Sequence, residues 1–142
     1  MGLTGLVGAT AFGIAAHSTA DTSGEGKLTA IAAFAAAQAG EILLVDIRRP
    51  DEWQRTGIAE GAVPIDMRRP DFTDAVLAAR ASPTPPIALI CARGVRSARM
   101  TARLTDAGLT PIIDVPEGML GSFAGPGWVK RDLPLQSWNA EG

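Results

Sequence analysis

The chain contains a single cysteine, Cys91, and the residues after it have the types and spacing that thiol chemistry needs. An apolar run at positions 87–90 ends at the cysteine, Ala-Arg-Gly-Val-Arg follow, and a helical pattern opens at Ser97. Backbone N–H groups of a tight loop and of a helix's first turn converge on one hollow, where they bind anions. Cysteines at helix N-termini beside arginine are often ionised near neutral pH. We therefore expect Cys91 to be a reactive thiolate.

The loop that follows Cys91 is predicted to bind an anionic substrate. Gly94 can take backbone angles closed to other residues, and Ser97 can cap the helix or donate its hydroxyl to the sulfur. Arg93 and Arg96 can each hold an oxyanion or tie the loop to a neighbouring carboxylate. A free cysteine more often simply packs in a core, but a core thiol needs no glycine and two arginines beside it. The predicted binding loop is Ala92, Arg93, Gly94, Val95, Arg96 and Ser97.

Length and composition indicate one globular domain. The chain has 142 residues, 46% of them hydrophobic, and a net charge of −2, so nothing global points to a nucleic-acid partner. One cysteine excludes an internal disulfide, and with the single histidine, His17, far away in sequence a zinc site is not expected. No metal or cofactor is implied.

The first twenty residues differ from the rest, being small, apolar and uncharged. This segment is too short and too rich in glycine for us to predict a membrane-spanning helix. Ser-Thr-Ala before Asp21 would suit a signal-peptidase site, but the basic segment of a signal peptide is missing. Two interpretations stay open: an exported, periplasmic protein if this segment is cleaved, and a cytoplasmic one otherwise. We assign residues 1–26 to a leader or flexible segment and 27–142 to the domain.

Short apolar runs alternate with helical patterns along the domain, which predicts an α/β fold with a mainly parallel central sheet flanked by helices. Expected helices span residues 27–40, 48–57, 69–81 and 97–108. Expected strands span 41–47, 61–66, 87–90 and 111–115, with a glycine-rich loop at 116–127 and a short helix and extension in 128–138. Ligands bind beyond the carboxyl ends of parallel strands. That edge should carry Asp46, Asp66, Cys91 and Asp114/Val115.

Two residues after the first strand are predicted to support the loop. Asp46 should face it, pairing with Arg96 or accepting loop N–H bonds, although a surface carboxylate that serves the next helix is an equal alternative. Arg48 could assist anion entry, but we expect it to pair with Glu52. Trp53 is predicted to lie in the core.

Four segments together resemble the rhodanese-like sulfurtransferase domain over residues 28–138: "LLVDIRRPDEW", "GAVPID", "ALICARGVRSARMTARLTDAGL" and "IIDVPEGM". The resemblance implies a thiosulfate sulfurtransferase-like enzyme built as a single domain. It implies that Cys91 takes a sulfane sulfur as a persulfide, cradled by the amides of residues 92–97. The donor would be thiosulfate or a similar small molecule, and the acceptor cyanide, a thiol or an acceptor protein.

Other functions remain open at this point. Related phosphatases and arsenate reductases carry Cys-x5-Arg, whereas this chain has Cys-x4-Arg, and one residue less removes up to about 3.5 Å of chain. The tighter hollow suits a sulfur atom better than a phosphoryl group. A persulfide-carrying binding or sensor module with little turnover is a further alternative. Where many family members have histidine, this chain has Gly57, so no general base is evident.

Overall fold

The computed structural model describes residues 26–140, so the predicted leader lies almost wholly outside the described residues. The elements run α1 (Ala30–Gln38), β1 (Leu43–Asp46), α2 (Pro50–Thr56), β2 (Ile58–Ala59), β3 (Val63–Pro64), α3 (Phe72–Ala79), β4 (Ile87–Ile90), α4 (Val95–Asp106), β5 (Ile112–Asp114) and β6 (Leu135–Gln136). Within this range no helix has the length and apolarity needed to cross a bilayer.

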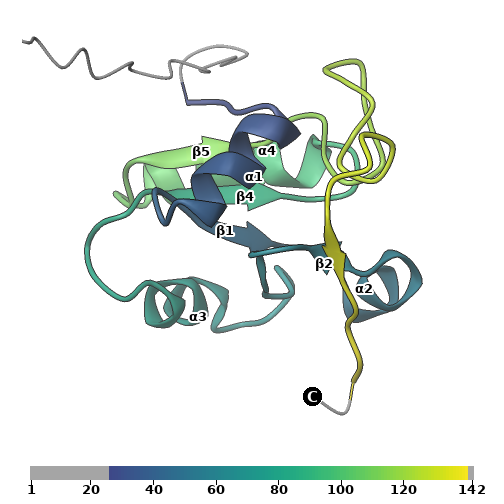
Figure 1. Cartoon of the computed structure of the whole chain (residues 1–142). Coiled ribbons are helices and arrows are strands. Elements are labelled where there is room, and N and C mark those ends of the chain that lie inside the picture. The colour runs from purple at the N-terminus through teal and green to yellow at the C-terminus, as the bar shows by residue number, and fades with distance from the viewer. Residues whose placement is uncertain (1–25, 141–142) are drawn as a thin grey trace, which may run out of the picture.

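A four-stranded parallel sheet in the order β3-β1-β4-β5 forms the centre of the domain (Figure 1). Strands β1 and β4 are the inner pair, which explains their nearly continuous apolar sequences. Pro64 lies on the edge strand β3, which suits proline because it has no N–H to offer a second neighbouring strand. Asp46 pairs in register with Ile90, so β1 ends level with the residue before Cys91.

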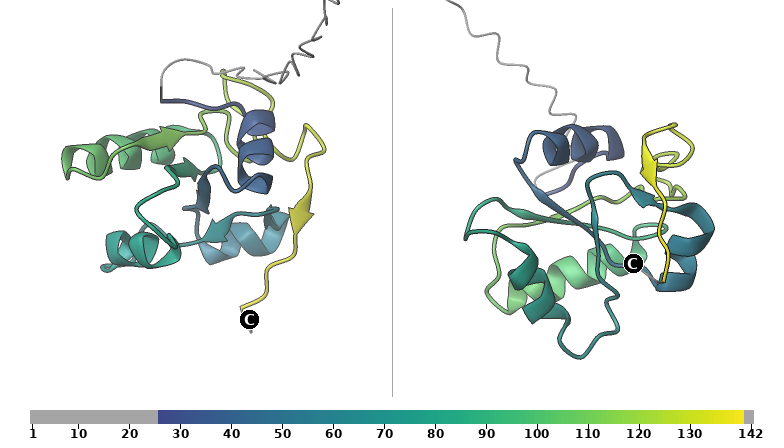
Figure 2. Two further views of the ribbon diagram at one scale, coloured as in Figure 1. Left: turned by 60° about the vertical axis from the view of Figure 1, so that its left-hand side comes forward. Right: turned by 60° about the horizontal axis from the view of Figure 1, so that its bottom comes forward.

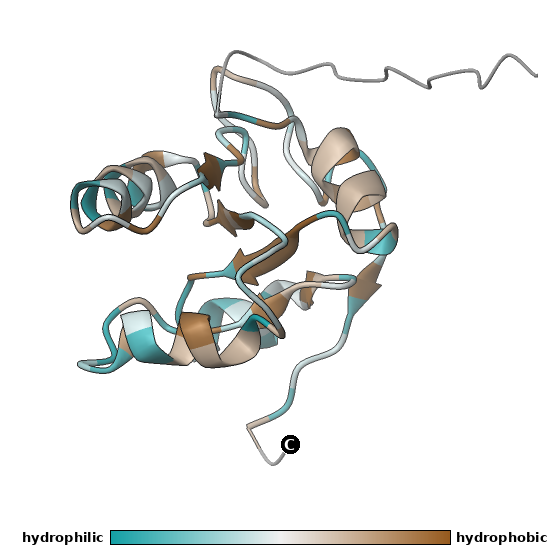
Figure 3. Ribbon diagram, turned by 90° about the vertical axis from the view of Figure 1, so that its left-hand side faces the viewer, coloured by the Kyte–Doolittle hydropathy of each residue, from teal (hydrophilic) through white to brown (hydrophobic). Residues whose placement is uncertain are grey.

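Alternate residues of the strands point to opposite faces and build two apolar layers. Figure 2 shows α1 on one side of the sheet and α3 with α4 on the other, and Figure 3 shows hydrophobic strands between the helices. The α1 layer includes Ala30, Ala33, Leu44, Ala88, Ile90 and Trp128. The opposite layer includes Val45, Phe72, Val76, Leu89, Cys91, Met100, Leu104 and Ile112. The predicted α/β architecture is confirmed.

The structure corrects two element predictions. Helix α4 begins at Val95, two residues before the expected start at Ser97, because Gly94 turns the chain in a left-handed conformation with φ 85°. The tail has no helix in residues 128–134 and instead forms turns followed by β6. Strand β6 belongs to the C-terminal tail, which is yellow in Figure 1, and it pairs antiparallel with β2. Both strands are two residues long, too short for a periodicity in the sequence to reveal either.

The cysteine loop lies directly against the segment that follows β5. The N–H of Met119 donates to the Cys91 carbonyl at 2.9 Å, and that of Leu120 donates to Ala92 at 2.8 Å. A side chain at Gly94 would fall on the Pro116 carbonyl oxygen. The absence of a Cβ there lets the two backbones touch.

Gly94→Ala should therefore destabilise the fold more than a matched change at Gly108. Both glycines have similar φ angles, 85° and 88°, so each alanine incurs the left-handed penalty of about 1–2 kcal/mol. A Cβ at Gly108 meets nothing within 4 Å, whereas one at Gly94 meets backbone. In urea unfolding we expect Gly94→Ala to lower the free energy of unfolding by about 3 kcal/mol or more. Gly108→Ala should lower it by much less. Equal losses would contradict the close packing of the two segments.

Candidate active site

Cys91 follows β4 at the carboxyl edge of the sheet, and its side chain is only 1% exposed. Its sulfur accepts the backbone N–H of Gly94 at 3.1 Å and that of Ser97 at 3.3 Å. Two amide donors aimed at one sulfur stabilise negative charge on it, whether as a thiolate or as a longer sulfur anion. The structure thus brings two of the predicted loop amides onto the Cys91 sulfur.

Ser97 is fully buried and contacts the sulfur directly. The Cys91 thiol donates to the Ser97 hydroxyl oxygen over 3.4 Å, and the hydroxyl itself can donate to the Gly94 carbonyl at 3.3 Å. Ser97 does not cap α4, since the cap position belongs to Gly94. Ser97 therefore lies beside the sulfur, as one prediction required, but it accepts a hydrogen bond from the thiol instead of donating one to it.

Arg96 makes a two-pronged ion pair with Glu52 of α2. Its nitrogens lie 2.6 and 2.8 Å from the two carboxylate oxygens, which joins the cysteine loop to the neighbouring helix. Glu52 is largely buried, and the Arg96 hydrogen bonds lower its pKa from an ordinary 4.5 to about 2. The prediction that Arg96 would pair with Asp46 is wrong, as is that of an Arg48–Glu52 pair.

Asp46 and Arg48 instead pair with each other, and both side chains are completely buried. Arg48 binds the carboxylate through Nε and Nη2 and also donates to Thr56 Oγ1 and the Gly57 carbonyl, each at 3.0 Å. The pair ties the end of β1 to the end of α2. Because its donors are already engaged, the buried Arg48 guanidinium is not available to receive an anion.

Arg93 is the exposed cation of the loop, and within residues 26–140 no carboxylate forms an ion pair with it. It donates only weakly, to the carbonyls of Leu120 and Gly121 at 3.5 and 3.3 Å. A hollow of about 300 Å³ adjoins it, which also holds Lys130, a residue that the sequence analysis missed. The lining contains Arg93, Leu120, Gly121, Ser122, Gly125, Pro126 and Lys130, with no acidic side chain. This hollow thus holds two cationic side chains and adjoins the cysteine loop at Arg93.

The glycine-rich loop of residues 116–127 is pinned at its base. Glu117, 1% exposed, accepts two hydrogen bonds from Arg131 at 2.7 and 2.9 Å and one from the Ala30 N–H at 3.0 Å. At the tip, the side chain of Phe123 is fully exposed. The anchored base holds the loop against Cys91.

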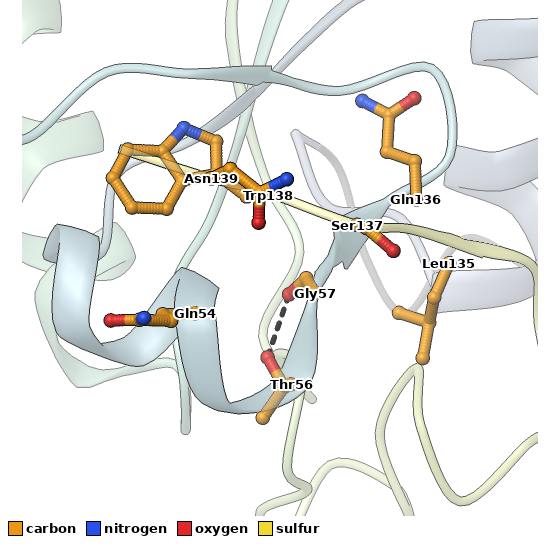
Figure 4. Close-up of a pocket in the computed structure, with 8 residues that line it drawn as sticks. All are labelled: Gln54, Thr56, Gly57, Leu135, Gln136, Ser137, Trp138 and Asn139. Atoms are coloured by element: carbon orange, nitrogen blue, oxygen red, sulfur yellow. Dashed lines mark hydrogen bonds between the residues drawn. The ribbon is translucent and has the colours of Figure 1, made fainter. Parts of the chain in front are cut away.

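A second hollow, of about 360 Å³, lies between α2 and the C-terminal segment (Figure 4). It is lined by Gln54, Thr56, Gly57, Leu135, Gln136, Ser137, Trp138 and Asn139. None of these side chains titrates near neutral pH and none belongs to the cysteine loop.

Across residues 26–140, no three His, Cys, Asp or Glu side chains lie close enough together to form a metal site. The cysteine loop is therefore the better candidate for chemistry.

Asp114 and Asp66, the other predicted edge residues, have different surroundings. Asp66 is neutralised by Arg68 two residues later, at 2.7 Å, on the surface. Asp114 is 4% exposed, and burial raises the pKa of its carboxyl above the ordinary 3.8. Only its position at the end of a strand could be predicted for Asp114 from the sequence.

Comparison with known proteins bears on this geometry. The profile of the rhodanese-like domain family matches residues 31–121. A thiosulfate sulfurtransferase structure from Pseudomonas aeruginosa is 25% identical with a TM-score of 0.62, over 80% of this chain but only 20% of its own. Rv0390 from M. tuberculosis is 25% identical with a TM-score of 0.61, over 80% of this chain and 98% of its own.

A third similar structure has a different description. It is a protein of unknown function and possible tyrosine phosphatase from Rhodopseudomonas palustris, 25% identical with a TM-score of 0.57, over 78% of this chain and 83% of its own. No curated protein matches the chain.

The Glu52–Arg96 pair should make stability depend on pH. Because the folded state lowers the Glu52 pKa, the pair stabilises fully above about pH 4.5, and this stabilisation is lost as the pH falls toward about 2. We expect Glu52→Gln to lower the free energy of unfolding by up to about 3 kcal/mol near pH 7, and by less to the extent that solvent screens Arg96. The loss should become smaller as the pH falls. Urea unfolding across that pH range measures this difference, and the exposed variant Asp51→Asn serves as the control. A loss that stays constant down to pH 2 would contradict the pairing.

Proposed function

This chain belongs to the rhodanese-like domain family, and from that premise we propose that it moves a sulfane sulfur from thiosulfate or a similar donor to cyanide or a thiol. The carrier is a persulfide on Cys91. The observation that carries the proposal is the pair of amide donors, from Gly94 and Ser97, on the Cys91 sulfur. They can stabilise a sulfur anion without any metal or cofactor.

The proposed reaction has two displacements. The Cys91 thiolate attacks the outer sulfur of thiosulfate, the sulfur–sulfur bond of the donor breaks, and sulfite leaves with its electron pair. Cyanide then attacks the outer sulfur of the persulfide anion, thiocyanate leaves, and the thiolate is restored. Sulfur and charge balance in each step. The amides of Gly94 and Ser97 face the sulfur of Cys91, and we expect the loop amides to stabilise the outer sulfur of the persulfide as well.

Arg93 and Lys130 are proposed to receive the anionic part of the donor. Both line the hollow beside the loop, and its lining contains no carboxylate to compete for them. Arg96 is less available, since Glu52 already occupies its guanidinium with two short bonds. Its proposed role is to hold the loop, which replaces the expectation that it would offset donor charge.

The same ion pair bears on the phosphatase alternative, which one similar structure's description raises. A phosphoryl group bound in a cysteine loop presents three anionic oxygens that need several free donors. With Glu52 on Arg96, the loop has fewer to offer. A single sulfur atom needs only the two amides that already face it, which favours sulfur transfer.

Thiosulfate should load one sulfur atom onto Cys91. After incubation and gel filtration, we expect intact mass to rise by one sulfur in the wild type and not in Cys91→Ser, with cyanide restoring the original mass. Turnover of phosphate esters by the same preparations is the control for the phosphatase alternative. A mass gain in Cys91→Ser, or phosphatase activity without sulfur loading, would refute the proposal.

Removing either cation of the hollow should weaken donor binding. Loss of one charge contact is worth roughly 1 kcal/mol at a surface site, so Arg93→Ala and Lys130→Ala should each raise KM for thiosulfate about fivefold with kcat little changed. Arg103→Ala removes the same charge from the exposed side of α4 and serves as the matched control. Equal effects from all three variants would mean that the overall field, not the hollow, attracts the donor.

A further inference from the structure

Three large apolar side chains lie exposed beside the cysteine loop. Val95 is 58% exposed in the first turn of α4, two residues after Arg93. Arg93 donates to the carbonyls of Leu120 and Gly121, which places Leu120, itself 41% exposed, against the same loop. Phe123 follows three residues after Leu120 and is fully exposed. Single exposed apolar residues are ordinary, but apolar side chains that gather at one place on a surface indicate a contact with another molecule.

The turn that carries Phe123 is closed by its own hydrogen bonds. Ser122 and Gly125 donate their N–H groups to each other's carbonyls, at 2.9 and 3.2 Å. The Ser122 hydroxyl donates to the Pro116 carbonyl at 2.9 Å and accepts the Ala124 N–H at 3.1 Å. Figure 1 shows this glycine-rich loop in yellow-green, projecting at the upper right beyond the carboxyl ends of the parallel strands. The fold thus holds a phenylalanine out in water, where only a partner could bury it.

The same surface carries cations that have no acidic partner. In the part of the chain that the structure describes, no carboxylate forms an ion pair with Arg93 or Lys130, which share the hollow beside Leu120. The whole chain has a net charge of −2, so this positive charge is local. Cations next to exposed apolar side chains complement a surface that combines carboxylates with an apolar group.

We propose that the exposed surface beside the cysteine loop docks an acceptor protein whose thiol lies on an acidic, partly apolar segment. The inference rests on the proposed function, for which it names the class of acceptor. This docking patch consists of Arg93, Val95, Leu120, Phe123 and Lys130.

The transfer to such an acceptor is a single displacement. The acceptor thiol first releases its proton to solvent, and its thiolate attacks the outer sulfur of the Cys91 persulfide anion. The bond between the two persulfide sulfurs breaks, and its electron pair stays on Cys91 as a thiolate. The acceptor leaves as a persulfide anion. Sulfur, electrons and charge balance, and no oxidant or reductant takes part.

A small donor or a membrane does not account for the docking patch. The hollow of about 300 Å³ suffices for a small anion, and neither Val95 nor Phe123 lines it. An anionic membrane would attract cations and a phenylalanine, but it offers no thiol to receive sulfur. A cysteine side chain on a protruding segment is as slender as a small thiol, so docking on the patch is compatible with the enclosure of Cys91.

The first test compares sulfur transfer from preloaded Cys91 to three synthetic peptides, followed by the intact mass of the full chain. Each peptide has one cysteine. In the first, leucine and glutamate flank it; in the second, lysine replaces glutamate; in the third, serine replaces leucine. At low salt we expect the first peptide to accept sulfur at least about tenfold faster than the second, with the difference shrinking as salt is added. It should also react at least about fivefold faster than the third.

The second test removes the aromatic side chain. Phe123→Ala should slow transfer to the first peptide at least about fivefold and leave transfer to cyanide unchanged. Leu77→Ala is the matched control, because it removes a side chain that is 39% exposed on α3, at the opposite end of the domain in Figure 1, and it should change neither rate. Since Phe123 is fully exposed, its removal should not alter urea unfolding, which separates lost docking from lost stability.

Equal rates with the glutamate and lysine peptides, or an unchanged peptide rate in Phe123→Ala, would overturn the docking patch. Binding to phosphatidylglycerol vesicles that Phe123→Ala abolishes would overturn it too, because the patch would then fit a membrane. Docking is also measured without sulfur, by the fluorescence anisotropy of a labelled first peptide with serine in place of cysteine, and Phe123→Ala should weaken this binding by a similar factor. If Cys91 fails to load sulfur, the proposed function fails while this binding remains measurable. Loading without any peptide preference refutes the docking patch alone.

Discussion

The contact between two backbone segments around the Cys91 sulfur is the constraint on which the site depends. The loop after β4 can direct amides onto the sulfur only while it is held in its left-handed turn at Gly94. That turn is held because the chain after β5 hydrogen-bonds to the carbonyls of Cys91 and Ala92 at 2.8–2.9 Å. The ion pair between buried Glu117 and partly exposed Arg131 in turn anchors this second segment. The geometry of one sulfur atom is therefore set by residues that are far apart in sequence.

Charge around the loop is divided between support and recognition. Arg48 and Arg96 are each matched by a buried or nearly buried carboxylate, and both join neighbouring elements. Arg93 has only carbonyl partners and faces the hollow that it shares with Lys130. Arginines that look alike in the sequence thus differ in availability, because a carboxylate reaches two of them and not the third.

Much of the fold could be predicted because it depends on local patterns. Apolar runs identified the inner strands, and their alternation with helical patterns identified the α/β fold. The partners of charged residues could not be predicted, because they depend on how helices meet. Glu52 lies 44 residues before Arg96 and comes beside it only when α2 packs near the loop. Lys130 was missed for the same reason, since only the folded chain after β5 brings it to the hollow.

The enclosure of Cys91 has a consequence for how the chain withstands oxidation. A disulfide requires its two sulfurs to come within about 2 Å, with the Cβ atoms about 4 Å apart. A thiol that is 1% exposed cannot reach the equally enclosed thiol of another copy unless one loop opens. The chain also has no second cysteine to form an internal crosslink. Only small reagents can therefore reach the sulfur of the closed loop. Two copies of the chain do not form a disulfide through Cys91 while both loops stay closed, even in oxidising surroundings.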